Sequence, residues 1–476
     1  MATKKDLVEA HAFSRRRLVT AFVSGAPGGR EVEPVRPGRV LIGGIALSVL
    51  LLAGAAIAGF LLGRPPAQWL AQGSFIISKD TGEQYVVMQG EPSPLLQRVP
   101  NYVSAQLLLG DAELTPFTVR DKYIRTVALG EDLGIEGAPA GLPSASELVD
   151  DGWTACTGDG LGIKLAVQET PAVQDLTGSA FLVASEGKQW LIATAPPVGD
   201  QEGRAWRFAM PDDEISASTV GNQLQFGATP VEVDEEWLNL FPTASGTDLE
   251  KESFGITRAG QAVGYGDTRT DLSQFVIGDL LISAASGRYY LLGDDAPQQL
   301  SPFAAMVYGI VGRQAVEVPN DLNAKFDDTT VPAEWPTSLP TAVTSGAMCA
   351  ELHPGPATAA RVSLATNPTG AADPAGDDPI SPGRHDVDVE PSAGAYVLSG
   401  SDDAATGGTP YVIDTKGEKY LLGPLVPTYI GYEDVTPPLV PSTWMQFFDT
   451  GVPLTTNSAR RVPEDAPPAD SEADAG

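Results

Sequence analysis

The two cysteines, Cys156 and Cys349, are the side chains of this sequence with the clearest capacity for covalent chemistry. Neither belongs to a CxxC pair, and two thiols cannot by themselves supply the four ligands of a structural zinc site. In an oxidising compartment they would form a disulfide, and closing so long a loop stabilises a fold by roughly 5 kcal/mol in the chain-entropy model. Two buried, unpaired cysteines are the alternative. We predict the disulfide, because the topology expected below places both residues outside the cytoplasm.

Groups for acid–base or phosphate chemistry are few. The three histidines are His11, His353 and His385, and none lies in a recognisable catalytic motif. His385 stands among aspartates and could bind a metal, but a solvated loop explains it more simply. The sequence contains no GxxxxGK[ST], GxSxG or HExxH pattern, so it offers no phosphate-binding loop, nucleophile elbow or zinc-protease helix. We therefore predict no catalytic, cofactor-binding or metal-binding residue, and a protein that is not an enzyme.

The charge is strongly negative and unevenly distributed. The 476 residues carry 61 Asp or Glu against 30 Lys or Arg, which gives a net charge of −31. Residues 1–39 are the exception, with eight basic side chains against four acidic ones. So acidic a main part repels phosphates, which argues against nucleic acid as a partner. The 51 glycines and 40 prolines predict many turns and short strands rather than long helices.

Residues 40–62 form an uninterrupted apolar run without charge or proline. A helix of that length is long enough to cross a bilayer of about 30 Å, and the basic excess before it predicts a cytoplasmic N-terminus. A cleaved signal peptide fits less well, since the run is too long and begins too late. Segment 3–25 has helical spacing of apolar residues. With Arg15, Arg16 and Arg17 it could lie on anionic lipid or contact a cytoplasmic partner.

Four segments of the remaining chain share one pattern, in which an apolar run leads to a turn glycine and an aromatic three residues later. Turn residues between β-rich runs indicate β-hairpins whose aromatics pack into small cores, whereas a ligand platform is the weaker alternative. The repeat residues are Gly82 and Tyr85, Gly187 and Trp190, Gly287 and Tyr290, and Gly417 and Tyr420. Short segments around Trp237, Trp335 and Trp444 follow three of the four and are expected to close each unit.

These observations predict a single-pass membrane protein with a β-rich α+β extracytoplasmic part, in which four small repeat modules surround a central core. A Pro-, Gly- and Asp-rich segment at about 366–393 is expected to be an exposed loop, and the acidic tail to be disordered. The expected divisions are a cytoplasmic helix 1–39, a transmembrane helix 40–62, repeat modules 63–120, 181–250, 279–336 and 396–455, core parts 121–180, 251–278 and 337–395, and a tail 456–476.

The N-terminal segment 3–25, the phrase GIEGAPAGLPSASELVDDGWTAC at 134–156 and the repeats resemble EccB, a membrane subunit of the actinobacterial type VII (ESX) secretion system. The resemblance implies an inner-membrane scaffold braced by the disulfide at Cys156 and Cys349. It also implies self-association and, as partners, an EccC-like translocating ATPase, EccD-like and EccE-like subunits and a mycosin-like protease. ATP hydrolysis has been proposed for that family, but no motif here supports it. A membrane-anchored cell-wall-binding protein is the second hypothesis, and an anchored hydrolase or ATPase the third.

Overall fold

The computed structural model describes residues 3–24, 37–62, 65–196, 203–227, 229–243, 248–324, 334–355, 358–401 and 407–463. The chain divides into two units, residues 1–67 and residues 68–476, and each is described by itself. Most of the tail predicted to be disordered lies outside the described residues. Its first residues differ from the prediction, because α10 (Thr456–Ala459) is capped by the Thr455 side chain and buries Ala459.

The first unit contains two helices, α1 (Lys4–Ser24) and α2 (Pro37–Leu62). Both form where the sequence predicts them, because neither segment contains an internal proline. The large apolar side chains described on α2, from Leu41 to Leu52, are exposed on all sides of the helix. None of the helices in the described part of the chain is long and apolar enough to cross a membrane. The span over residues 40–62 stays a prediction.

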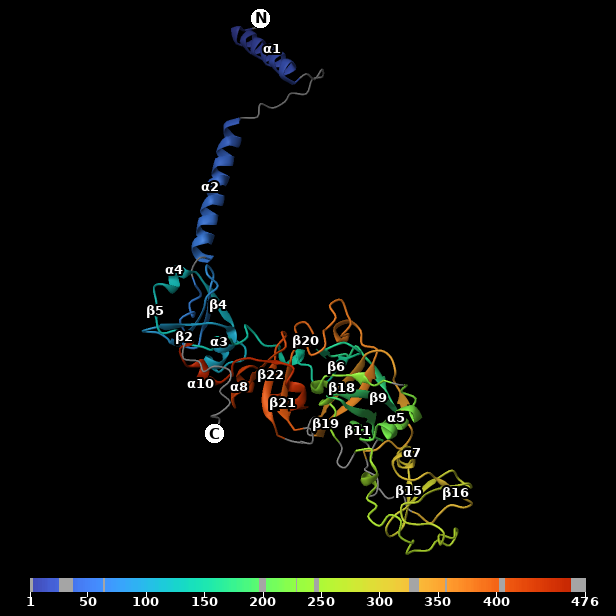
Figure 1. Cartoon of the computed structure of the whole chain (residues 1–476). Coiled ribbons are helices and arrows are strands. Elements are labelled where there is room, and N and C mark those ends of the chain that lie inside the picture. The colour runs from blue at the N-terminus through green and yellow to red at the C-terminus, as the bar shows by residue number, and fades with distance from the viewer. Residues whose placement is uncertain are drawn as a thin grey trace. The chain divides into compact units, whose positions relative to one another are not determined.

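The second unit is rich in β-structure, and its described strands form four sheets (Figure 1). The first sheet has the order β4-β1-β2-β3-β5. Its strands are β1 (Phe75–Ser78), β2 (Gln84–Gln89), β3 (Leu95–Val99), β4 (Pro116–Val119) and β5 (Ala128–Leu129), and its helices are α3 (Tyr102–Leu109) and α4 (Asp121–Ile124). Asn101 caps α3 by accepting a hydrogen bond from the Ser104 amide, and Gly110 ends the helix in the left-handed conformation.

The second and third sheets repeat this plan. The second contains β9 (Ser179–Ser185), β10 (Lys188–Thr194), β11 (Ala205–Ala209), β12 (Val231–Glu232) and β17 (Thr341–Ala342), with helices α5 (Glu214–Gln223) and α6 (Glu235–Leu238). The third contains β13 (Leu280–Ser283), β14 (Tyr289–Leu292), β15 (Pro297–Leu300) and β16 (Val316–Val318), with helix α7 (Pro302–Val311). In each, a strand after the long helix returns parallel to the first strand of the hairpin.

The fourth sheet is the largest, with eleven strands contributed by distant parts of the chain. Nine follow the order β20-β7-β6-β18-β24-β21-β22-β23-β25, while β19 pairs with β18 and β8. These strands are β6 (Trp153–Thr157), β7 (Ile163–Val167), β8 (Gln174–Leu176), β18 (Met348–Gly355), β19 (Thr358–Thr366), β20 (His385–Val389), β21 (Ala395–Gly400), β22 (Thr409–Ile413), β23 (Glu418–Leu421), β24 (Leu439–Pro441) and β25 (Asp449–Thr450). The helices α8 (Val426–Tyr429) and α9 (Ser442–Met445) accompany the C-terminal strands.

The fourth hairpin occupies a different place in the plan from the other three. Gly82, Gly187 and Gly287 each lie between the first and second strands of their sheets. Gly417 lies between β22 and β23, whereas the strand that β24 joins in parallel is β21. β21 therefore takes the place in this group that β1 takes in the first sheet. The Gly417 turn joins the second and third strands of the group, whereas the other three turn glycines join the first and second strands. The sequence pattern found this hairpin correctly, but it matched the hairpin to the first pair of strands of the other groups when it is the second pair.

The segment predicted to be an exposed loop at about 366–393 is partly structured. β20 pairs in parallel with β7 at an edge of the largest sheet, and Lys164 on β7 forms an ion pair with Asp386 on β20. His385 therefore lies on a strand, with its ring 5.5 Å from that of Phe447. A polar edge strand has little apolar signal of its own, which explains why the sequence did not reveal it.

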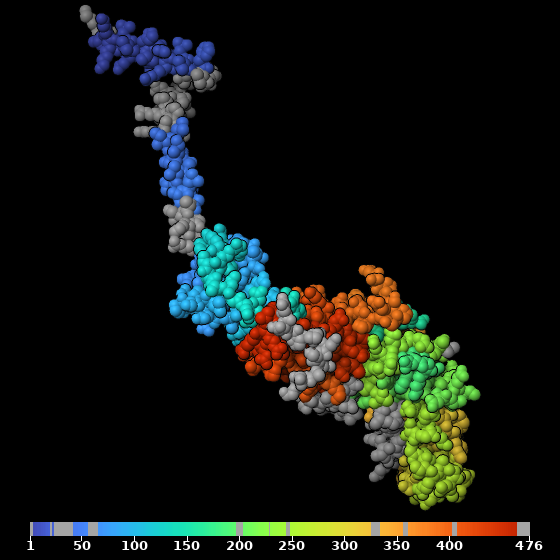
Figure 2. Space-filling view, turned by 60° about the vertical axis from the view of Figure 1, so that its left-hand side comes forward, coloured from blue at the N-terminus to red at the C-terminus, as the bar shows by residue number. Residues whose placement is uncertain are grey.

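The core is continuous across sheet boundaries. One cluster joins Trp153 of β6 with Trp237 of α6 and Trp444 of α9, all fully buried. Another joins the first sheet to the C-terminal strands through Phe75, Val86 and Tyr420, among others. Figure 2 shows this junction from outside, where the blue-to-cyan surface of the first sheet meets the red C-terminal surface.

Candidate functional site

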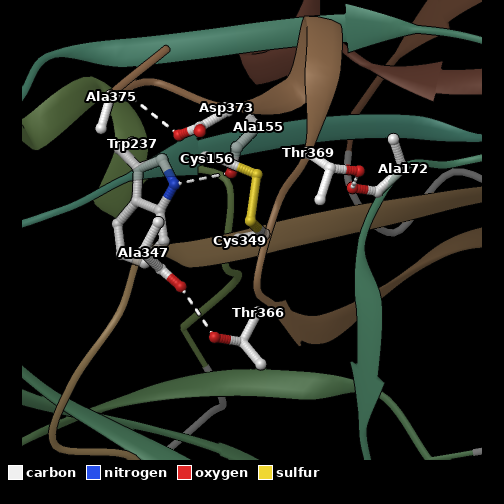
Figure 3. The surroundings of a disulfide bond; sticks show 10 residues. All are labelled: Ala155, Cys156, Ala172, Trp237, Ala347, Cys349, Thr366, Thr369, Asp373 and Ala375. Carbon is white, nitrogen blue, oxygen red and sulfur yellow. Dashed lines mark hydrogen bonds between the residues drawn. A yellow bond between two sulfur atoms is a disulfide. The ribbon is translucent and has the colours of Figure 1, made fainter. Parts of the chain in front are cut away.

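The described residues bring together one distinctive chemical feature, a buried disulfide with polar side chains beside it. Cys156 on β6 and Cys349 on β18 face each other directly across the two antiparallel strands. Their sulfurs are 2.07 Å apart, and both residues are completely buried (Figure 3). The predicted disulfide is therefore present. It joins two neighbouring strands of the largest sheet and closes a sequence separation of 193 residues.

The two faces of the sheet differ in character at this point, because alternate residues of a strand point to opposite sides. On one face Trp153, Ala350 and Leu352 enter the main core. Just beneath that side, the Trp237 indole donates a hydrogen bond of 2.9 Å to the Ala155 carbonyl (Figure 3). The other face carries the disulfide, packed against Ala365 and Val173.

The disulfide face continues into charged side chains along β18 and β19. Glu351 is only 5% exposed, and its Oε2 atom has no hydrogen-bond partner. The hydroxyl of Thr154, directly across from Glu351 in the strand pairing, is also buried and unpaired. Burial raises the pKa of Glu351 to about 8, and the neighbouring carboxyls of Asp175 and Asp151 contribute to the shift.

Beside Glu351 lies a Ser–His–Asp arrangement. The Nε2 atom of His353 is 2.9 Å from the Ser363 hydroxyl, and its Nδ1 atom is 3.5 Å from a carboxylate oxygen of Asp151. Burial opposes ionisation of Asp151, but hydrogen bonds from His353 and the Gly152 amide lower its pKa overall. Ser363 lies inside the regular pairing of β19 with β18, not on the sharp turn that presents a hydrolase nucleophile. The arrangement fits a positioned polar network better than an acyl-transfer site.

This cluster was not predicted from the sequence, because His353 lies in no recognisable catalytic motif. The one available signal was alternation: in the strand MCAELHPG, Cys349, Glu351 and His353 share one face while the residues between them are apolar. Among the residues that the structure describes, no group of three or more His, Cys, Asp or Glu side chains could hold a metal ion.

The predicted repeat residues do not converge on one place. Each turn glycine has the positive φ that a tight hairpin turn favours, with values of 79° for Gly82, 77° for Gly187, 71° for Gly287 and 76° for Gly417. Their aromatics lie on the strands that follow. Tyr85, Tyr290 and Tyr420 are buried at 7%, 1% and 2% exposure. Trp190 is half-buried, with Lys188 and Arg207 over its ring. The four side chains occupy separate sheets, so they form no common ligand platform.

The predicted cytoplasmic-contact residues lie together on α1. Arg15, Arg16 and Arg17 are exposed in the middle of this helix. The same helix presents exposed apolar side chains, including Leu18 and Phe22 at 66% and 89% exposure. A basic and apolar helix of this kind suits either an anionic lipid surface or a protein groove.

The fold is one seen in solved structures of ESX complexes. The chain superposes on a chain of an intact ESX-5 inner membrane complex with a TM-score of 0.58 at 20% identity, covering 100% of this chain and 98% of that one. It superposes on a chain of the EccB3 dimer from the ESX-3 core complex with a TM-score of 0.60 at 19% identity, covering 82% of this chain and 100% of that one. At such identities the likeness establishes the fold alone.

The family follows from sequence. The family model described as "Type VII secretion system ESX-1, transport TM domain B" matches residues 1–468, and this chain belongs to that family, the EccB proteins. A relative from Mycolicibacterium smegmatis (strain MKD8), named ESX-1 secretion system ATPase EccB1, is 26% identical over 301 residues, which is 59% of this chain and 57% of that protein. The same-named protein of Mycobacterium tuberculosis (strain H37Rv) is 27% identical over 208 residues, 40% of this chain and 41% of that protein. The matches thus span about half the length of these relatives.

Proposed function

We propose that this chain is a structural, non-enzymatic subunit of a type VII secretion complex that builds the extracytoplasmic part of the machine and supports protein export. The observation that carries the proposal is the family match, which runs from residue 1 to residue 468 and so includes both helices and all four sheets. Similar solved structures include an inner membrane complex, a periplasmic assembly and an EccB3 dimer, which supports self-association here.

The proposed topology is a single pass through the inner membrane with the N-terminus in the cytoplasm. It rests on the uncharged run at residues 40–62 and on the basic excess of residues 1–39. Exposed leucines and isoleucines along α2 suit a lipid environment. The acidic unit of residues 68–476 would then lie in the periplasm, an oxidising compartment that maintains the Cys156–Cys349 disulfide.

The proposed partners are an EccC-like translocating ATPase, EccD-like and EccE-like membrane subunits and a mycosin-like protease, together with further copies of this chain. They come from membership of the EccB family. On the cytoplasmic side, Arg15, Arg16 and Arg17 of α1 are the proposed contact, because they form the densest basic cluster of the chain. The four hairpin groups and the intervening core parts are proposed as the surfaces through which copies assemble.

ATP hydrolysis is the competing function, since the similar mycobacterial proteins carry the name ATPase. A phosphate-binding loop needs glycines followed by Gly-Lys-Ser/Thr, and the one Gly-Lys pair, Gly187-Lys188, turns the β9–β10 hairpin instead. Purified full-length chain should release phosphate from ATP no faster than its buffer. Turnover that scales with protein concentration through successive purification steps would establish the competing function.

The scaffold role is tested by removing the chain from its own host. Deletion should abolish export through the corresponding secretion system, and a plasmid copy of the full chain should restore it. Secreted proteins in the culture filtrate are the readout, with a protein exported by the general secretory pathway as the control. Normal type VII export in the deletion strain would contradict the proposed function.

A further inference from the structure

The strongly acidic second unit has one dense basic stretch, which lies at the first sheet. Arg120, Lys122 and Arg125 fall within six positions of the sequence, and no other stretch of that length after residue 62 contains three basic residues. All three residues are exposed. They belong to α4 and to the two residues that flank this short helix.

A fourth basic residue joins them through the strand pairing. β1 and β4 are parallel, with Ser78 opposite Val119 at their carboxyl ends. The next residue of each strand is basic, Lys79 after β1 and Arg120 after β4, and the Lys79 amide donates a hydrogen bond of 2.8 Å to the Val119 carbonyl. Lys79 is exposed as well. We define the basic surface as Lys79, Arg120, Lys122 and Arg125.

Two carboxylates lie next to the basic surface, and both are held by local contacts. Asp121 accepts a hydrogen bond from the Ser78 hydroxyl and forms an ion pair of 3.5 Å with Arg125. Asp80 accepts a hydrogen bond of 2.9 Å from the Asp121 amide. The Arg125 side chain nevertheless remains 78% exposed. Because the four basic groups outnumber the two carboxylates, the surface is cationic.

The layer beneath the basic surface is apolar, and it includes the point where the chain enters the second unit. Trp69 is buried in one cluster with Ile124 of α4, on the face of the first sheet opposite to the one that α3 covers. Tyr123 packs against the same cluster and is half-buried, with the Lys122 ammonium 4.7 Å from the centre of its ring. Basic side chains beside half-buried aromatics are typical of surfaces that meet lipid headgroups.

The sequence ties this face of the first sheet to the predicted membrane span. Trp69 follows Leu62, the last residue of the apolar run, by seven positions, and a chain of that length reaches about 25 Å at most. Trp69 and the α4 layer that packs with it therefore stay close to the outer end of the span. Such proximity favours the bilayer over a soluble partner as the occupant of the basic surface.

We propose that the basic surface binds the headgroups of anionic phospholipids in the outer leaflet of the membrane that holds residues 40–62. The inference rests on the single-pass topology proposed above. The four cationic side chains attract lipid phosphates, whereas the same membrane repels the strongly acidic remainder of the unit. The contact thereby determines which face of the first sheet lies against the bilayer.

Hydrogen exchange of the full-length chain in lipid nanodiscs tests this inference. One set of discs contains an equimolar mixture of phosphatidylglycerol and phosphatidylcholine, and the other contains phosphatidylcholine alone. In the anionic discs we expect the amides of residues 116–129 to exchange roughly fivefold more slowly, the factor that one basic side chain adds to binding at an anionic surface. High salt should remove the difference, because it screens exposed charges.

Joint replacement of the three basic residues within 120–125 by glutamine should make exchange equal in the two kinds of disc. The matched control, which should behave as the wild type, places glutamine at three exposed basic positions elsewhere in the unit, Arg269, Arg384 and Lys416. Equal exchange of wild-type residues 116–129 in both discs, with residues 40–62 protected, would overturn this inference and leave the topology intact. Rapid exchange of residues 40–62 would overturn the topology and this inference with it.

Discussion

At the scale of single residues, the Cys156–Cys349 bond is the strongest constraint on the folded unit. It crosses from β6 to β18 in the middle of the largest sheet and closes 193 residues of chain. Replacing both cysteines by alanine should lower the free energy of unfolding by roughly 3–5 kcal/mol, mainly because the unfolded chain gains freedom. Denaturant unfolding checks this. The reduced wild type should approach the double variant, and equal stability of oxidised and reduced wild type would refute the expectation.

Two buried tryptophans offer a matched comparison of a satisfied and an unsatisfied indole. Trp237 and Trp444 are both completely buried, but only Trp237 donates a hydrogen bond, to the Ala155 carbonyl. The Trp444 nitrogen has no partner. Replacement by phenylalanine should therefore cost about 1 kcal/mol more at Trp237 than at Trp444, since it removes a hydrogen bond that only Trp237 makes. Unfolding midpoints of the two variants give the difference, and a larger loss at Trp444 would refute it.

Some features at the residue scale could be predicted from the sequence and others could not. The disulfide was predictable because only two cysteines exist, and the absence of a Walker motif was directly readable. The polar cluster was not predictable, because its members come from β8, β18, β19 and the segment before β6. Nothing in the sequence around Asp151 or Asp175 indicates that they approach Glu351.

At the scale of elements, the hairpin glycines differ in their surroundings although they share one backbone conformation. A Cβ at Gly82 would meet open space, whereas a Cβ at Gly417 would lie 2.9 Å from a methyl group of Val387 on β20. Alanine at Gly82 should cost about 1 kcal/mol through the positive φ alone. Alanine at Gly417 should cost more, because β20 must also move. Thermal unfolding of the two variants tests this ranking, and equal losses would show that β20 does not press on the turn.

The hairpins could be predicted from local sequence patterns, whereas the pairings between strands far apart in the chain could not. A turn glycine between two β-rich runs defines a hairpin within about fifteen residues, so all four hairpins were found from sequence. Aligning them required the parallel pairing of β24 with β21, which depends on contacts some forty residues apart. The pairing of β20 with β7 spans more than two hundred residues, and the polar composition of β20 gives no local signal for a strand.

At the scale of the whole molecule, charge is distributed unevenly along the chain. The N-terminal segment is basic and the remainder is strongly acidic, and this asymmetry supports a cytoplasmic N-terminus and an exported main unit. The core that joins the sheets through Trp153, Trp237 and Trp444 suits a part that transmits assembly contacts instead of turning over a substrate. Both features are consistent with the proposed role in contacts between subunits.

The most direct test of that account is to purify the tagged full-length chain from the membranes of its own host in mild detergent and to identify what accompanies it. We expect near-stoichiometric recovery of a large P-loop ATPase and of a multi-span membrane protein. Joint replacement of Arg15, Arg16 and Arg17 by glutamine should reduce recovery of the ATPase several-fold, while replacement of Lys4 and Lys5 on the same helix should not. Recovery of the chain alone, in several detergents and after crosslinking, would contradict the account.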